Sequence, residues 1–241
     1  MKKVITLLVL IAAITHSNAQ SDLTGQSVYG SWFMYFGTNK IADKWSIHTE
    51  AQLRYYETAS NFNQLLLRTG LNYHINSNAI ATVGYGYINT DPFFTEFSDP
   101  YGYSFFEDNL FSEQRIFEQF ILKNKVWEFN FEHRYRLEQR FVKNNFTGKT
   151  NTLNRARYRI QMTLPLTDIF FLNFYDEIFI NLQEDAFGQN RAYAALGVNV
   201  TEDLSMQFGY LKNHFSETNF DRFQVGLFYN TDLRGIFKKK K

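Results

Sequence analysis

Most of the chain alternates between apolar and polar positions, and the alternation is strictest in its middle third. The odd positions from Trp127 to Leu137 are aromatic or apolar apart from His133, and the even positions between them are Glu, Asn or Arg. The stretch from Arg155 to Leu164 alternates in the same way. A period of two places successive side chains on opposite faces of a β-strand. The pattern therefore predicts strands with one apolar face and one face rich in Arg and Glu.

Eleven segments show this alternation and end at turn-forming residues, which predicts an all-β fold. Most have ten or more residues, the length that a tilted strand needs to cross a bilayer. Strands of soluble proteins cluster nearer five or six residues. The predicted strands are 27–37, 45–57, 62–75, 79–89, 109–123, 126–141, 152–164, 169–183, 190–200, 204–213 and 220–230.

Short and long connections alternate along the chain. Tight turns are expected at 76–78, 123–125, 165–168 and 201–203, and longer loops at 90–108, 142–151, 184–190 and 214–219. Bacterial outer-membrane barrels have short periplasmic turns and longer extracellular loops. We therefore expect a single antiparallel transmembrane β-barrel of about 10–12 strands. Single-chain bacterial barrels have even strand numbers, whereas eleven segments are predicted. Either the segment 27–37 is not a full spanning strand, which gives ten strands, or one further strand exists, which gives twelve. We favour twelve.

The N-terminus has the pattern of a secretory signal peptide. Lys2 and Lys3 precede an apolar run at 4–14, and small residues at 17–19 form a cleavage site. Residues 1–19 are expected to be removed, which leaves 20–241 as one outer-membrane β-barrel domain. The chain contains no Cys, so disulfides, lipidation at cysteine and thiolate metal sites are excluded.

Composition supports a barrel in the membrane. Aromatic residues make up 18% of the chain, yet the mean hydropathy is −0.35. Transmembrane barrels combine these values, because half of each strand faces a polar interior. The net charge of +1 provides no general attraction for nucleic acid.

Arg and Lys are predicted to occupy different positions in the barrel. Parity within the strands assigns eleven of the twelve Arg to the inward face and places none of the thirteen Lys at an inward mid-strand position. A crowded interior favours Arg, whose guanidinium binds carboxylates in a bidentate manner and stays charged. We predict a lumen braced by Arg–Glu pairs, with water, loop acids such as Asp99 or Glu107, or bound anions matching the excess positive charge. The predicted network contains Glu50, Arg54, Arg68, Glu113, Arg115, Glu128, Glu132, Arg134, Arg136, Glu138, Arg140, Arg155, Arg157, Arg159, Glu177, Arg191 and Arg222.

The outward face is apolar, with Tyr and Trp near strand ends, as expected at a membrane interface. Two acids depart from this pattern, because Glu118 and Asp176 fall at outward parity in the middle of strands. A β-bulge that shifts the register is the favoured explanation. A functional carboxylate is the alternative.

Several motifs resemble the outer-membrane barrel family catalogued as domain of unknown function 2490. The resemblance implies an outer-membrane location in a Bacteroidetes-like bacterium, where Asn-Ala-Gln is common at signal-peptide cleavage sites. It implies no established activity and no catalytic residue. The motifs are Arg54, Arg68–Tyr73, Gly84–Tyr87, Glu113–Arg115, Arg134–Phe141, Arg155–Tyr158 and Gln189–Arg191.

One pair of residues raises the question of catalysis. His214 and Ser216 share a strand face, with a spacing similar to that of outer-membrane phospholipases. A Ser nucleophile needs a base and an orienting group, and Asn230 is a candidate for the latter. A polar extracellular loop is the favoured interpretation, so we do not expect an enzyme. The five His lack metal-ligand spacing, and neither a metal nor a cofactor is expected.

The leading hypothesis is an outer-membrane barrel with a braced lumen, whose role is structural or the narrow passage of small, preferentially anionic solutes. One alternative is an outer-membrane lipid hydrolase that uses the His-x-Ser pair. Another is a soluble periplasmic barrel that binds an apolar ligand, with its aromatic face inward. Expected partners are outer-membrane lipids and the barrel assembly machinery, without nucleic acid; the sequence does not determine the oligomeric state.

Overall fold

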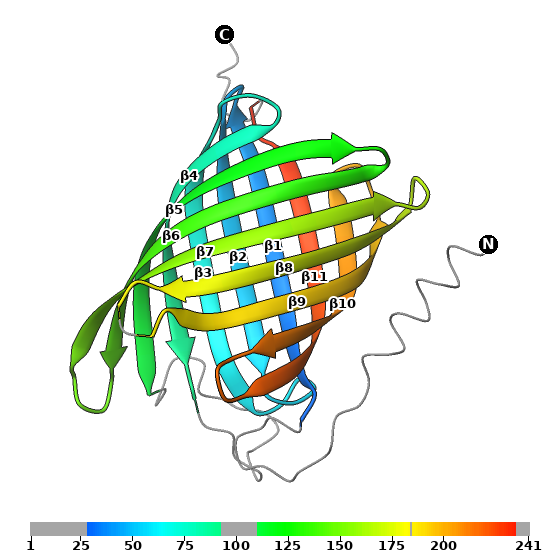
Figure 1. Cartoon of the computed structure of the whole chain (residues 1–241). Coiled ribbons are helices and arrows are strands. Elements are labelled where there is room, and N and C mark those ends of the chain that lie inside the picture. Colours follow the sequence, from blue (N-terminus) through cyan, green and yellow to red (C-terminus); the bar gives the residue numbers. More distant parts are fainter. Residues whose placement is uncertain (1–27, 93–109, 184, 235–241) are drawn as a thin grey trace.

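The chain folds into one closed β-barrel. The structure, a computed structural model, describes residues 28–92, 110–183 and 185–234, which form eleven strands (Figure 1). Among these residues, no helix is long and apolar enough to span a membrane. The strands are β1 (Gly30–Ala42), β2 (Trp45–Tyr55), β3 (Phe62–His74), β4 (Ala79–Thr90), β5 (Phe111–Val126), β6 (Phe129–Asn144), β7 (Thr150–Pro165), β8 (Phe170–Asn181), β9 (Phe187–Asn199), β10 (Leu204–His214) and β11 (Asn219–Asp232).

The barrel closes through a parallel pair. β1 runs parallel to β11, from Gly30 opposite Arg222 to Lys40 opposite Asp232, whereas all other neighbouring strands are antiparallel. The preference for twelve strands was therefore wrong for the described residues. An even number is required only when the first and last strands are antiparallel. Here β1 and β11 point the same way, so an odd number closes the sheet.

The two rims differ in their connections. Tight turns follow β1, β3, β5, β7 and β9, and we call this end the tight-turn rim. The connections after β2, β4, β6, β8 and β10 form the loop rim, which carries the longest one, between Thr90 and Phe111. β1 begins at the loop rim and β11 ends at the tight-turn rim, so the first strand starts and the last strand ends at opposite rims of the barrel.

The predicted strands match the observed ones, with shifts at some ends. β1 continues to Ala42, although Gly37 to Lys40 contain turn-forming residues. β5 continues through the turn expected at 123–125 to Val126, because Lys125 still pairs with Asn130. The turn instead contains Trp127, which lies outside the strands and is 86% exposed. Neighbouring strands thus override local turn preference.

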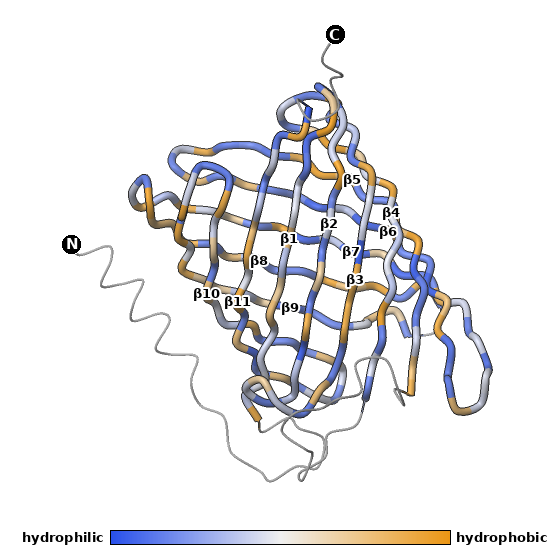
Figure 2. The backbone as a smooth tube through the Cα atoms, turned by 180° about the vertical axis from the view of Figure 1, so that it is seen from behind, coloured by the Kyte–Doolittle hydropathy of each residue, from blue (hydrophilic) through white to orange (hydrophobic). Residues whose placement is uncertain are grey.

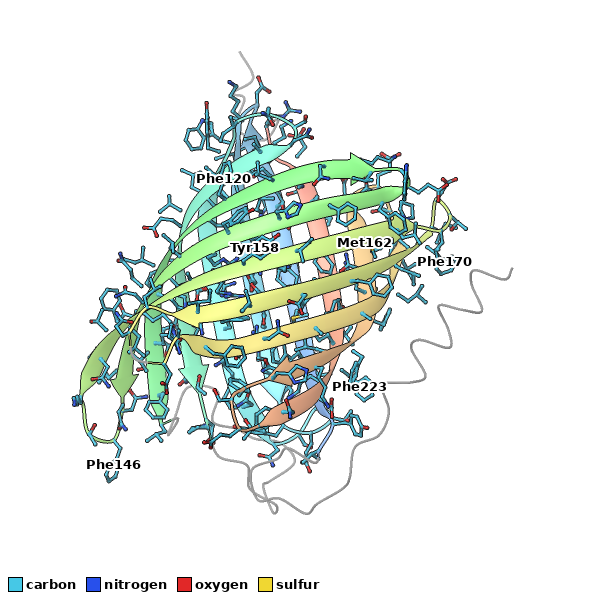
Figure 3. The ribbon with its side chains drawn as sticks, viewed as in Figure 1. Phe120, Phe146, Tyr158, Met162, Phe170 and Phe223 are labelled. Atoms are coloured by element: carbon cyan, nitrogen blue, oxygen red, sulfur yellow. The ribbon has the colours of Figure 1, made fainter. Side chains whose placement is uncertain are left out.

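Apolar side chains cover the outside of the barrel. Hydrophobic and hydrophilic residues are interspersed along the strands (Figure 2), and labelled side chains such as Phe120, Phe170 and Phe223 project from the wall (Figure 3). This orientation contradicts the alternative of a soluble barrel with its aromatic face inward. Every strand contributes at least one exposed large apolar residue, including Phe33, Trp45, Leu67, Val83, Ile116, Tyr135, Ile160, Phe170, Leu196, Phe208 and Phe223.

The parallel closure predicts a specific crosslink. Phe33 and Val225 are register partners on the outer face of β1 and β11, and the chain has no Cys of its own. We expect the double variant Phe33→Cys/Val225→Cys to form a disulfide, seen as a mobility shift on non-reducing gels. The control Phe33→Cys/Tyr229→Cys should stay reduced, because four residues along a strand add roughly 13 Å. Equal oxidation of both pairs, or oxidation of the control alone, would contradict the register.

Candidate functional site: the charged lumen

The lumen contains a cavity of about 1030 Å³ that is lined from both rims. His74 and Lys123 contribute to it near the tight-turn rim, and Tyr56 and Phe215 near the loop rim. Every arginine assigned to the inward face by parity lines this cavity. They are Arg54, Arg68, Arg115, Arg134, Arg136, Arg140, Arg155, Arg157, Arg159, Arg191 and Arg222.

Glu138 of β6 is the centre of the ion-pair network. Its side chain is fully buried, and Arg155 Nη2 and Arg157 Nη1 from the neighbouring strand β7 lie 2.5 and 2.7 Å from its carboxylate oxygens. Arg115 of β5 and Arg136 of β6 lie at 3.4 and 3.7 Å. One buried carboxylate therefore faces four guanidinium groups from three adjacent strands.

Two of these arginines connect Glu138 to other carboxylates. Arg157 also donates to Glu177 Oε1 of β8, at 2.8 Å. On the other side, Arg115 contacts Glu113 Oε1 at 2.6 Å. The network is thus continuous from β5 to β8. It links these four neighbouring strands through their side chains, in addition to the backbone hydrogen bonds between them.

The remaining pairs extend this bracing. Arg155, Arg157 and Arg159 form a row on β7, and each of them forms an ion pair with a glutamate. Further pairs are Arg68–Glu50 at 2.6 Å, Arg159–Glu132 at 2.6 Å, Arg134–Glu177 at 2.7 Å and Arg140–Glu113 at 2.7 Å.

Aromatic rings support the guanidinium groups from within the lumen. Phe117 and Phe179 are almost fully buried, and the guanidinium carbons of Arg136 and Arg157 lie 5.0 and 4.2 Å from their respective ring centres. Such cation–π contacts strengthen when the groups are desolvated. Gly84 makes room for one ring, because a Cβ there would lie 2.3 Å from Phe117. The sequence interpretation overlooked these rings, although both occupy inward parity.

Three lumen arginines are not matched by an acid. Among the described residues, no carboxylate lies within ion-pair distance of Arg54, Arg191 or Arg222. Asp99 and Glu107, the suggested loop partners, lie outside the described residues. With eleven arginines and Lys123 against five glutamates facing the described lumen, seven positive charges remain in excess.

Two assignments near the tight-turn rim are corrected. Glu128 does not face the lumen, because it lies exposed in the turn between β5 and β6. Lys123 does line the lumen, near the end of β5, with its Nζ 3.9 Å from Glu132 Oε2. The shift of this turn toward the C-terminus accounts for both changes.

The two outward acids lie where parity places them, without a bulge. Glu118 pairs in continuous register with Val83 and Leu137, so the bulge expected there is absent. Asp176 is also in register on the outer face, where its Oδ1 accepts a hydrogen bond from Asn190 Nδ2 at 2.9 Å. Both carboxylates are exposed on the outside of the barrel.

The candidate catalytic residues are not assembled. His214 Nδ1 lies 2.6 Å from Asn219 Oδ1, and Ser216 is exposed in the connection after β10. Asn230, the suggested orienting group, pairs with Thr38 near the tight-turn rim, at the opposite end of β11. The described ranges also contain no cluster of His, Cys, Asp or Glu that could hold a metal ion.

Removing different acids from the network is expected to lower the free energy of unfolding by different amounts. Replacing Glu138 by Gln leaves four guanidinium groups facing a neutral amide, and breaking a buried pair costs about 3–5 kcal/mol. Glu132→Gln is the matched control, since its side chain is 21% exposed and its loss should cost about 1 kcal/mol or less. Urea unfolding of the purified barrel measures the loss of stability in both variants. Equal midpoints for the two variants would contradict the central role of Glu138.

The fold is similar to that of a known porin. A solved structure of the NanC porin, in a rhombohedral crystal form, superimposes with a TM-score of 0.51 at 9% sequence identity. The match covers 83% of this chain and 97% of that chain, and at this identity it shows the fold alone. Among curated proteins, none matches. The family model described as "Protein of unknown function (DUF2490)" matches residues 29–224. The chain therefore belongs to the DUF2490 family.

Proposed function

We propose that the protein is a bacterial outer-membrane β-barrel whose lumen provides narrow passage for small, preferentially anionic solutes. The observation that carries this proposal is the excess of seven positive charges in the described lumen, from eleven arginines and Lys123 against five glutamates. A charged passage with low-dielectric walls concentrates ions of the opposite sign. Arg and Lys side chains are the groups that line anion-selective pores.

The outer surface supports a location in the membrane. Exposed apolar residues occur on every strand, whereas soluble monomers rarely expose a contiguous apolar patch above a few hundred Å². The strands contain 11 to 16 residues, enough to cross a bilayer when tilted. The signal-peptide pattern at 1–19 fits export, and lipids would then contact the apolar surface. The barrel assembly machinery would insert such a protein.

The lumen is too crowded for a wide pore. If the cavity of about 1030 Å³ extends over a bilayer core roughly 30 Å thick, its mean cross-section is on the order of 35 Å². That area suits a partly hydrated ion or a small organic anion. The ion pairs that narrow it are buried and linked, so opening a wider path would expose unpaired charges at high cost.

The competing roles have weaker support. A lipid hydrolase needs a nucleophile, a base and an orienting group within hydrogen-bond reach. His214 and Ser216 lie at the loop rim, while Asn230 lies near the other rim. A purely structural role remains the second candidate, because the same bracing that narrows the lumen also stiffens the wall.

Accessibility labelling tests the location. Ile160 and Gln161 are neighbours on β7, but Ile160 faces outward and Gln161 lines the lumen. In intact outer membranes, we expect a small water-soluble thiol reagent to label Gln161→Cys and to leave Ile160→Cys unlabelled until the barrel is unfolded by heating in SDS. The chain contains no Cys, so the background is low. The reverse pattern would contradict a membrane barrel with this orientation.

Planar-bilayer recording tests the passage. In a KCl gradient we expect small current steps with a reversal potential displaced toward that of chloride, because the lumen carries excess positive charge. A large unselective conductance would contradict the braced lumen, and cation selectivity would contradict the anion preference. Silent but correctly folded protein, verified by heat-modifiable mobility on gels, would favour the structural role.

A further inference from the structure

We infer that the lumen contains a discrete oxyanion-binding site around Trp32, formed by Arg54, Arg191 and Gln224, which takes a small protonated oxyanion such as hydrogen phosphate. This inference rests on the proposed function, since it assigns the anion class and the position at which the anion binds. Part of the excess charge of the lumen comes from arginines without an acidic partner among the described residues. Two of them, Arg54 of β2 and Arg191 of β9, contribute side chains to the cavity beside Trp32 of β1.

The two cations of the site are oriented by neutral amides. Arg54 Nε donates to Gln52 Oε1 at 3.0 Å, and its Nη1 donates to Gln64 Oε1 at 2.7 Å. With the amide of Gln189 oriented so that its oxygen faces Arg191, this oxygen accepts from Nη2 at 2.9 Å. A glutamine fixes a guanidinium in place without neutralising it, whereas the arginines of β7 are matched by glutamates. Arg54 and Arg191 therefore keep their full charge.

Trp32 brings these cations together. The guanidinium carbons of Arg54 and Arg191 lie 3.8 and 4.9 Å from the centre of its ring. In the sheet, Trp32 is the register partner of Arg54 on β2 and of Gln224 on β11. Trp32 also belongs to a buried apolar cluster with Tyr193, Ala195 and Leu211, which holds the ring in position on the lumen wall. The site is thus built on regular strands and does not depend on a loop.

Several buried polar atoms at this place have no partner within the described residues. They are the indole Nε1 of Trp32 and both amide atoms of Gln224. The two residues are only 5% and 2% exposed, respectively, and both line the cavity. Buried polar groups in native proteins are almost always hydrogen-bonded, so such a cluster points to a missing ligand or to water.

The unpartnered atoms also indicate the chemistry of the ligand. The indole N–H, the Gln224 amide N–H and the two guanidinium groups are donors, which suit the oxygens of an anion. The oxygen of Gln224 is an acceptor, which suits a hydroxyl of the ligand. Hydrogen phosphate offers negatively charged oxygens and a P–OH group in one small molecule. Chloride offers no hydroxyl and only a single acceptor atom.

Trp32 provides its own reporter for the test. The chain has three Trp, and the other two lie away from the lumen, with Trp45 40% exposed on the outer face and Trp127 86% exposed in a turn. In a Trp45→Phe/Trp127→Phe background, emission comes from Trp32 alone. We expect inorganic phosphate, titrated into the purified barrel at constant ionic strength, to change this emission saturably. Chloride should need at least a tenfold higher concentration.

Single charge removals separate a built site from a diffuse positive potential. Arg54→Gln and Arg191→Gln should each weaken phosphate binding at least tenfold. Arg140→Gln is the matched control, because it removes one lumen charge while Glu113 keeps Arg115 as a partner, and it should change binding less than twofold. Equal weakening by all three variants, unchanged binding in Arg54→Gln and Arg191→Gln, or equal binding of chloride would each overturn the site. Heat-modifiable mobility verifies that every variant is folded.

Experiments can overturn the proposed binding site and the proposed passage independently of each other. Anion-selective currents together with no saturable response of Trp32 would support the passage and overturn the site. Phosphate binding that Arg54→Gln and Arg191→Gln weaken, in a protein that carries no anion current, would support the site and overturn the passage.

Discussion

A closed β-sheet gives each side chain only two directions, toward the lumen or toward the outside, and the rest of this structure depends on that constraint. Parity along a strand decides which direction a residue takes, and every strand has a hydrogen-bonded neighbour on both sides. Among the eleven strands that the structure describes, no backbone edge is left unpaired, as an apolar surrounding requires. The chain can therefore place aromatic side chains outside and guanidinium groups inside within the same strand.

Inside the barrel, the partner of each arginine determines its role. Around Glu138 the guanidinium groups of β5, β6 and β7 are matched by acids, so their charges stabilise the wall and narrow the cavity. Around Trp32 the partners of Arg54 and Arg191 are glutamines, so the charge remains available to a solute. In the proposed passage, one type of side chain thus serves both bracing of the wall and attraction of anions.

The parallel pair of β1 and β11 has a consequence for the whole architecture. Because both strands run from the loop rim to the tight-turn rim, Trp32 and Gln224 become register partners at the closure. An antiparallel closure would give these residues other partners. The strand count and the placement of the unmatched lumen groups therefore have the same structural origin.

The sequence alone determined the strands, their faces and the inward position of the arginines, because the period of two depends only on local backbone geometry. It placed the β5–β6 turn too early and assigned Glu128 to the lumen, because the pairing of Lys125 with Asn130 outweighs local turn preference. It also suggested bulges at Glu118 and Asp176 that the unbroken registers exclude. Only the tertiary structure decided that eleven strands close through a parallel pair and that Arg54 and Arg191 converge on Trp32. These contacts join residues that are far apart in the chain. Parity along a strand predicts whether a side chain faces the lumen, but it does not predict which other side chains it contacts there.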